Sequence, residues 1–307
     1  MSKHRFYQVD VFTRTPLAGN ALAVFPDAKG LHPETMQALA REMNLSETTF
    51  VTRSKTATRR VRFFTPAAEI PLAGHPTIGT WWLLAELELI KVPRRGVHRV
   101  TQETGRGVLP VDITTERGQV RRVEMTQPLP EFGPNAPDAS ALAAAIGGDA
   151  RTLANGPAAQ LVTTALPQLM VPVRSLAALK ALPSGGTGPE LTRVLRTVSP
   201  ACDCAMMFTL DTRAKDVTVR CRMFSPALGV PEDPATGSAA GALGCYLVWH
   251  NLVRPHGGVA NIVIEQGAEI SRPSRMHVTI TAGNGGEITD VRVGGEAVTI
   301  ISGDVRL

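Results

Sequence analysis

Two short stretches combine prolines, small residues and side chains that can exchange protons or bind anions. The first, Arg62 to Leu84, contains His75 in the sequence AGHPT. The second, Arg222 to Leu247, contains Asp233 and Ser238 in the sequence DPATGS. Imidazole and carboxylate groups can transfer protons or orient a substrate. In both stretches these groups come just before a run of small and apolar residues, so they mark the start of a predicted helix.

The start of an α-helix is a favourable place for an anion, because its first backbone N–H groups lack partners and carry a partial positive charge. The helices predicted for Thr77–Ile90 and Thr236–Trp249 would each offer such a place to a carboxylate. The Asp, Thr and Ser side chains at the second helix have another interpretation, since these residue types commonly cap helices. For His75, capping or simple packing is likewise an alternative to a catalytic role.

The two stretches repeat one pattern, which indicates a duplicated architecture. At a constant separation of 160 residues in the numbering, an arginine, a phenylalanine and two prolines match: Arg62 with Arg222, Phe64 with Phe224, Pro66 with Pro226 and Pro71 with Pro231. Matching prolines break the backbone in the same order, which chance apolar similarity seldom does. Each half would present a strand, a loop and a helix start. Two helix starts facing one another across a cleft would form a pocket rich in hydrogen-bond donors.

Glu47 is a third candidate for chemistry. It lies in NLSETTFV, between an amphipathic helix predicted for His32–Met43 and a strand that includes Phe50 and Val51. A glutamate in this position is usually solvated, since Glu is seldom buried without a partner. If Glu47 points into an apolar cleft instead, loss of hydration raises its pKa and makes it a usable base and acid near neutral pH.

Length and composition exclude several classes of protein. The chain has 307 residues, 43% hydrophobic and 19% charged, which is typical of a globular protein of two domains. The net charge of +5 comes without interleaved aromatic residues, so no nucleic-acid partner is expected. The most apolar run falls short of the ~20 residues of a membrane span, and no secretory signal is visible. We therefore expect a cytoplasmic protein without a membrane partner.

The predicted elements are mostly strands, with one apolar helix in each half, which gives an α+β fold class. The four cysteines lack the spacing of a zinc or redox site, so we expect buried, reduced thiols and no bound metal. The run Pro128–Asp138 is rich in proline and is the predicted linker. The domains would be 1–127, completed by a C-terminal strand at 296–307, and 128–295.

Six motifs are distributed from one end of the chain to the other: YQVDVFT, GNALAVF, NLSETTFV, FFTPAAEIPLAGHPTIGT, DPATGSAAGAL and EQGAEISRPS. Together they resemble the phenazine-biosynthesis PhzF-like family of isomerases over nearly the whole chain. The resemblance implies a diaminopimelate-epimerase-like fold, in which two pseudo-symmetric halves each wrap a β-barrel around a central helix and the active site lies between them. It also implies a homodimer and a reaction that needs no metal or redox cofactor.

The resemblance assigns roles to particular residues. It implies that Glu47 shuttles the proton as acid and base, with His75 and Asp233 beside it as further catalytic residues. Substrate binding is expected of residues at the two helix starts: Gly74, Pro76, Thr236, Gly237 and Ser238. Related epimerases and proline racemases use a cysteine at each helix start. Neither AGHPTIG nor DPATGSA contains a cysteine, so racemisation by two thiols is not predicted.

The function predicted from these motifs is a cofactor-independent isomerase. It would move a proton within a small carboxylated metabolite, cyclic or derived from an amino acid, and trans-2,3-dihydro-3-hydroxyanthranilate isomerisation is the activity for which the family is named. Single-base epimerisation or tautomerisation of another amino-acid-like substrate is an alternative. A non-catalytic protein that binds small molecules on the same fold is another. Deuterium uptake into substrate carbon would separate an enzyme from a binding protein.

Overall fold

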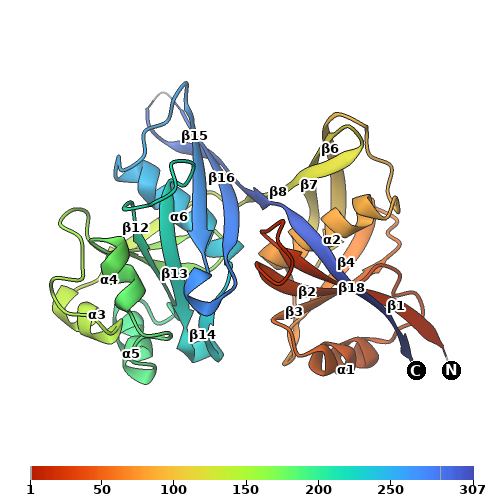
Figure 1. The fold of residues 1–307 in the computed structure, drawn as a ribbon, viewed down its shortest axis with the longest axis horizontal. Helices are drawn as coiled ribbons and strands as arrows, with labels where there is room; N and C mark the ends of the chain where they lie inside the picture. Colours follow the sequence, from red (N-terminus) through yellow and green to blue (C-terminus); the bar gives the residue numbers. More distant parts are fainter. Residues whose placement is uncertain (1, 284) are drawn as a thin grey trace. The chain divides into compact units, whose positions relative to one another are not determined.

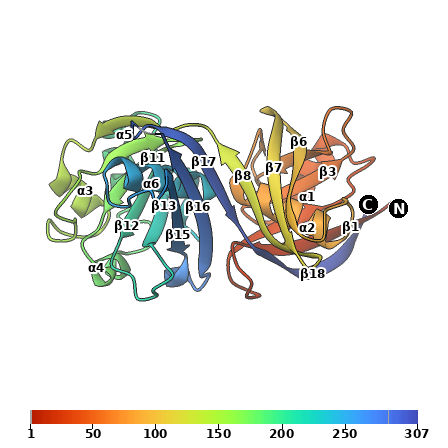
Figure 2. The same cartoon turned by 90° about the horizontal axis from the view of Figure 1, so that it is seen from above.

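The computed structural model describes residues 2–283 and 285–307, and the chain divides into two compact units. Unit 1 is Met1–Thr126 together with Gly294–Leu307, and unit 2 is Gln127–Val293. In Figures 1 and 2, unit 1 carries the red to yellow segments and the dark blue C-terminal strand, whereas unit 2 carries the green to blue segments. Unit 1 is therefore built from both ends of the sequence.

In unit 1, neighbouring strands pair in the order β18–β1–β2–β3–β4–β6–β7–β8, and the short β5 pairs with β4. Helix α2 (Gly74–Glu86) contacts strands from several parts of this sheet, which therefore curves around it. Helix α1 (Pro33–Met43) packs against β3 and β4. The strands are β1 (Lys3–Val11), β2 (Asn20–Phe25), β3 (Glu47–Thr52), β4 (Arg59–Phe64), β5 (Glu69–Ile70), β6 (Gly96–Thr104), β7 (Gly107–Glu116), β8 (Gln119–Gln127) and β18 (Ala297–Arg306).

In unit 2, helix α6 (Gly237–Trp249) contacts β10, β11, β15 and β16 and lies among the strands in Figure 1. The strands are β9 (Glu131–Asn135), β10 (Gln160–Thr163), β11 (Pro167–Pro172), β12 (Cys204–Thr209), β13 (Val219–Ser225), β14 (Val230–Asp233), β15 (Val259–Gln266), β16 (Ser274–Ala282) and β17 (Ile288–Gly295). The outer helices are α3 (Ala139–Ala145), α4 (Leu176–Ala181) and α5 (Pro189–Val198), with single 3₁₀ turns η1 (Pro226–Leu228) and η2 (Ala268–Ile270).

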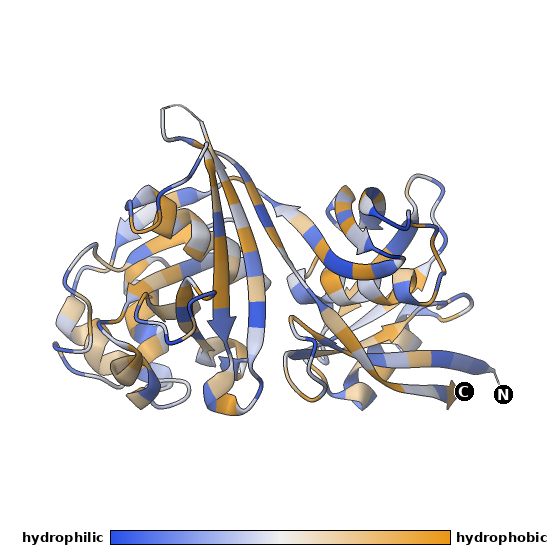
Figure 3. Cartoon of the chain, turned by 45° about the horizontal axis from the view of Figure 1, so that its top comes forward, coloured by the Kyte–Doolittle hydropathy of each residue, from blue (hydrophilic) through white to orange (hydrophobic). Residues whose placement is uncertain are grey.

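The composition of α2 and α6 explains their central positions. Both helices are apolar around their whole circumference, and every residue from His75 to Ala85 is buried. A helix without a polar face has to be covered on all sides. At Gly79 a β-carbon would lie 2.6 Å from Val11 Cγ2 and 2.8 Å from Leu22 Cδ2, so the absence of a side chain lets α2 approach β1 and β2 closely. The surrounding strands alternate between hydrophobic and hydrophilic residues, as Figure 3 shows.

The two units share one strand topology. Successive pairs from β1 to β7 are antiparallel, parallel, antiparallel, parallel and antiparallel. The pairs β10–β11, β11–β12, β12–β13, β13–β15 and β15–β16 follow the same order. In each unit a short strand and then the central helix follow the fourth of these strands. The predicted α+β class, with a helix enclosed by strands in each half, is confirmed.

Three local predictions differ from the structure. The constant separation of 160 residues between matching positions of the two halves is wrong beyond the loop, because η1 adds three residues in unit 2. Gly74 and Gly237, the first residues of α2 and α6, are therefore 163 apart in the numbering. Helix α2 begins at Gly74 rather than Thr77, since a proline is tolerated in the first turn of a helix. The predicted linker contains β9, which pairs with β10 and whose Pro134 is compatible with an edge position.

Among the described residues, no helix is both long enough and apolar enough to cross a membrane.

Candidate active site

Glu47 and His75 meet in unit 1. Glu47 is the first residue of β3 and His75 is the second residue of α2. Glu47 Oε2 lies 3.3 Å from His75 Nε2, with 19% of the Glu47 side chain and 8% of the His75 side chain exposed. The separation is that of an ion pair, although the direction of the ring N–H does not make a hydrogen bond to that oxygen. A carboxyl group that is largely removed from water but still reachable, beside an imidazole, is an arrangement suited to proton transfer.

Hydrogen bonds between buried side chains hold the two residues in place. Thr49 lies on the same face of β3 as Glu47, and its hydroxyl is 2.8 Å from that of Thr80 in α2. The Thr77 hydroxyl donates to the carbonyl of Ala73 at 2.8 Å. Gln102 donates to Thr77 at 3.3 Å and accepts from Trp81 Nε1 at 2.9 Å. The start of α2 is thus fixed against β3 and β6, which sets the Glu47–His75 separation.

Burial determines the charge of His75. Loss of hydration lowers the pKa of the imidazole from 6.5 to about 3, although a carboxylate lies nearby. His75 is therefore neutral over the whole physiological range. A neutral imidazole can donate one hydrogen bond and accept another, but it does not act as a cationic acid.

Gly74 and Pro76 flank His75, but only one of them has a backbone N–H group with which to bind a substrate. Gly74 is the first residue of α2, so its backbone N–H lies in the first turn, where N–H groups have no partner within the helix. Pro76 is buried and has no N–H group. Of the two, Gly74 can donate a hydrogen bond to an anion, whereas Pro76 can offer only apolar surface and a fixed backbone.

A second polar cluster surrounds the start of α6 in unit 2. The Thr236 hydroxyl donates a short hydrogen bond to Asp233 Oδ2. Gln266 Nε2 donates to the carbonyl of Asp233 at 2.7 Å and to the Thr236 hydroxyl at 3.1 Å, and Gln266 Oε1 accepts from the Thr236 N–H at 3.3 Å. Thr236 is the N-cap residue, yet within the described chain its side chain makes no capping hydrogen bond. Its hydroxyl therefore orients Asp233 instead of capping the helix.

Three further side chains fix the first turn of α6. Gln127 Nε2 donates to the carbonyl of Gly237 at 2.9 Å. Thr164 donates to Gln127 Oε1 at 2.8 Å and to the carbonyl of Ser238 at 3.3 Å. Gln168 Nε2 donates to Ser238 Oγ at 3.3 Å. Sequence reasoning missed these residues because they come from separate parts of the chain and form no motif. The only signal was Gln168, a polar residue within the apolar strand β11.

The structure thus brings the predicted residues together in two groups. Glu47 and His75 meet at the start of α2, next to Gly74 and Pro76. Asp233 and Thr236 meet at the start of α6, where Gly237 and Ser238 form the first turn. That one substrate contacts both groups stays a prediction.

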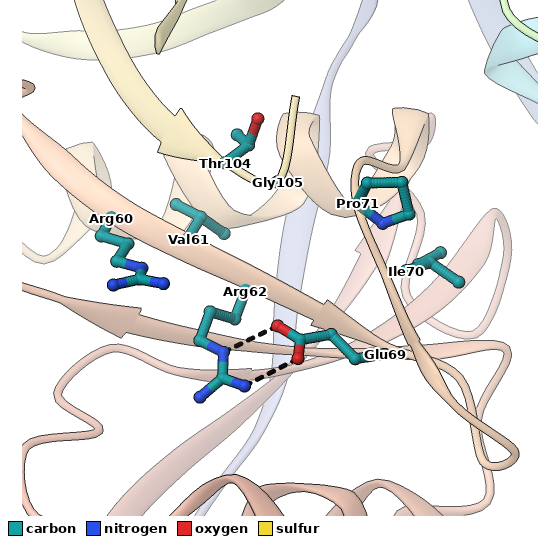
Figure 4. Close-up of a pocket in the computed structure, with 8 residues that line it drawn as sticks. All are labelled: Arg60, Val61, Arg62, Glu69, Ile70, Pro71, Thr104 and Gly105. Carbon is teal, nitrogen blue, oxygen red and sulfur yellow. Dashed lines mark hydrogen bonds and ion pairs between the residues drawn. The ribbon is translucent and has the colours of Figure 1, made fainter. Parts of the chain in front are cut away.

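One pocket in unit 1 contains none of the predicted site residues. Its volume is about 350 Å³, and Figure 4 shows Arg62 paired with Glu69 among its lining residues, through two hydrogen bonds of 2.7 Å. In unit 2 the corresponding Arg222 pairs with Glu232 in the same two-fold way, but both side chains are buried beneath α4. The pocket is therefore the uncovered counterpart of a surface that α4 covers in the other unit.

All four cysteines are buried and unbridged, as predicted. Cys204 in β12 is the counterpart of Glu47 in β3. Each directly precedes a residue that pairs with the matching phenylalanine of the next strand: Ala205 pairs with Phe224, and Thr48 pairs with Phe64. Burial raises the pKa of the Cys204 thiol. Its thiolate is therefore disfavoured, and Cys204 is a poor candidate for a base. Within residues 2–283 and 285–307, no group of three or more His, Cys, Asp or Glu side chains is placed to hold a metal ion.

Comparison with known proteins identifies the family and the fold of the chain. The sequence pattern of the PhzC-PhzF family, described as phenazine biosynthesis-like protein, matches residues 9–303. The chain belongs to this family. A trans-2,3-dihydro-3-hydroxyanthranilate isomerase of Pseudomonas aeruginosa is 37% identical over 311 residues, with 99% of this chain and 100% of that protein covered. The PhzF family protein of Bacillus anthracis has a solved structure with a TM-score of 0.90 and 30% identity, and the match covers 100% of both chains.

The fold of this PhzC-PhzF member is also found in an epimerase. A hydroxyproline epimerase from Agrobacterium vitis, solved with bound trans-4-hydroxy-L-proline, has a TM-score of 0.64 at 12% identity, over 99% of this chain and 92% of that one. At that identity the likeness concerns the fold alone. Together with the family match, it supports the diaminopimelate-epimerase-like architecture and places the chain among relatives that are named isomerases.

Proposed function

We propose that this chain is a cofactor-independent isomerase that moves a proton within a small carboxylated metabolite, with Glu47 as the acid and base. The observation that carries the proposal is the position of Glu47 Oε2, 3.3 Å from His75 Nε2 at the start of α2. A single carboxyl group can take a proton from one carbon and return it to another. That chemistry requires a base that is shielded from bulk water but open to the substrate.

In the proposed reaction, the Glu47 carboxylate removes a proton from a substrate carbon, and the electron pair of the broken C–H bond spreads through a conjugated system. Glu47, now a neutral acid whose proton can exchange with solvent, gives a proton to a different carbon of that system, so atoms and charge balance within one substrate. His75 is neutral, because burial lowers its pKa to about 3. It therefore places no full positive charge beside the carboxylate, which remains available as a base, and it can orient the substrate by hydrogen bonding.

We assign substrate binding to the starts of the two central helices. Their first N–H groups can hold a carboxylate, and Gly74, Gly237 and Ser238 belong to these turns. Asp233 is held by Thr236 and by Gln266 through its own carbonyl, which suits a group that must accept a hydrogen bond from substrate in one fixed direction. Each of these turns offers hydrogen-bond donors of the kind that the charged end of the metabolite needs.

The substrate to be tested first is trans-2,3-dihydro-3-hydroxyanthranilate, on which the Pseudomonas aeruginosa relative is named to act. Incubation in deuterated water, followed by NMR, should show isomerisation and deuterium at the carbon that receives the proton. A protein that only binds the compound would leave every carbon position unlabelled. An epimerase would label the carbon at which configuration is inverted and leave the double bonds in place, so one spectrum separates all three activities.

The proposal includes a cytoplasmic homodimer, which rests on resemblance to the family. Light scattering at several protein concentrations tests the dimer. A monomer at concentrations where the enzyme is active would remove that part of the proposal.

A further inference from the structure

The interior of unit 2 contains a buried amide that packing alone does not explain. Gln168 in β11 is fully buried, and it points toward α6 from the strand next to β12. Its Nε2 donates to Ser238 Oγ at 3.3 Å, whereas its Oε1 accepts no hydrogen bond from any described residue. Burying an amide with one unsatisfied end is unfavourable for folding. A residue with this property requires a reason other than stability.

Comparison of the two units shows that the fold does not need a polar residue at this position. Gln168 pairs with Cys204 across the parallel strands β11 and β12, just as Leu22 pairs with Glu47 across β2 and β3. Leu22 is fully buried and apolar. Unit 1 therefore fills the equivalent position with a leucine, and the glutamine in unit 2 serves something that differs between the units.

The second residue of the central helix is what differs. It is His75 in unit 1, facing Glu47, and Ser238 in unit 2, facing Gln168. A hydroxyl group has one proton to donate and can accept from other groups. Because Gln168 donates to Ser238 Oγ, the Ser238 proton remains available for a different acceptor. Ser238 is only half-buried, so a ligand can reach that proton.

We infer that Gln168 is a positioning residue: by donating to Ser238 Oγ it directs the Ser238 hydroxyl proton toward a ligand carboxylate at the start of α6. The inference rests on the carboxylate-binding part of the proposed function. It names a residue outside the helix starts, and it makes Ser238 a fixed donor instead of a freely rotating hydroxyl. Gln168 acts through Ser238 and does not itself touch the reacting atoms.

The test measures binding instead of turnover. Anthranilate serves as the probe, because it presents a carboxylate on a six-membered ring and cannot undergo the proton shift. Titration calorimetry compares wild type with Gln168→Leu, the substitution that copies Leu22. We expect affinity to fall about tenfold or more, the effect of weakening one hydrogen bond to an anion. The melting temperature should stay equal or rise, because the variant removes an unsatisfied buried amide.

A double-mutant cycle shows whether Gln168 acts through Ser238. Ser238→Ala should weaken anthranilate binding by a similar factor, and adding Gln168→Leu to it should change affinity no further. Gln160→Leu is the matched control, since Gln160 is a hydrogen-bonded glutamine of the neighbouring strand β10, bound to Gly133 and His250. It should leave the affinity for anthranilate unchanged. Gln168→Met repeats the measurement if the leucine variant does not fold.

Several results would overturn the inference. A Gln168→Leu or Gln168→Met variant that binds anthranilate as tightly as wild type would contradict it. So would losses of affinity that add up in the double-mutant cycle, or a loss of the same size in Gln160→Leu. Failure of the wild-type protein to bind anthranilate at millimolar concentration would do so as well. The outcome is independent of the proposed reaction: if trans-2,3-dihydro-3-hydroxyanthranilate is not isomerised but the cycle behaves as expected, the reaction is wrong and the role of Gln168 stands.

Discussion

The neutral state of His75 predicts a specific dependence of stability on pH. The pKa of this imidazole is 6.5 in an exposed chain and about 3 in the folded protein, because burial disfavours the charged ring. Below about pH 6.5 the unfolded chain binds a proton that the folded chain does not. His75 therefore lowers the free energy of unfolding as the pH falls from about 6.5 toward about 3, and it has no such effect above this window.

The size of the effect follows from the two pKa values. One pKa unit corresponds to about 1.4 kcal/mol, so moving from about pH 7 to about pH 5 costs the folded state about 2 kcal/mol through His75 alone. For a unit of this size, that corresponds to roughly 8 °C in melting temperature. His75→Gln keeps a polar side chain of similar size and removes the titration.

The assay is urea unfolding of wild type and His75→Gln at several pH values between about 5 and about 7.5. Other titrating groups contribute to both proteins, so the difference between the two curves isolates His75. Wild type should lose about 2 kcal/mol more than the variant across this range. Parallel curves would mean that the folded imidazole accepts a proton as readily as an exposed one. A cationic His75 would then face Glu47, and the proposed division of roles between the two residues would have to be given up.

Four other substitutions test the proposed site and its scaffold. Glu47→Gln keeps shape but cannot carry a proton, so isomerisation should fall by about 10³-fold or more with substrate affinity unchanged; turnover within about tenfold of wild type would exclude Glu47 as the base. Asp233→Ala should reduce kcat/KM by about 10² while the circular dichroism spectrum is retained. Arg222→Met leaves the buried Glu232 carboxylate without its ion-pair partner and should lower the free energy of unfolding by about 3 to 5 kcal/mol. Arg62→Met breaks the partly exposed pair with Glu69 and should cost about 1 kcal/mol or less in the same unfolding assay.

Periodicity and proline spacing predicted much of the fold. The matching of Arg62 with Arg222 and of Phe64 with Phe224 revealed the duplication, because strand alternation and proline breaks are local properties of a sequence. The three extra residues of η1 remained hidden, since another proline, Pro231, happened to continue the constant separation. The strand β9 was hidden for a similar reason: proline and glycine usually indicate a loop, and only pairing with β10 shows otherwise.

For the site, motifs pointed to Glu47 and His75, but their separation is a tertiary property. It depends on the hydrogen bond between Thr49 and Thr80, which are distant in sequence. The glutamines at the start of α6 could not have been identified in advance. Gln168 and Gln266 lie on strands far apart in the chain, and neither has a neighbour in sequence whose chemistry suggests a role.

The pairing of β1 with β18 determines the order in which the chain can complete its fold during synthesis. All of unit 2 is translated between the two parts of unit 1, and domains generally fold as units while the chain emerges. Unit 2 can therefore finish folding while β1 is paired with β2 alone and still lacks β18. The nine residue pairs between β1 and β18 can form only when the last strand leaves the ribosome. We expect the sheet around α2, which β18 also contacts, to be completed only at that late step, so that a nascent chain arrested before Ala297 carries a folded unit 2 and a unit 1 whose sheet lacks its last strand.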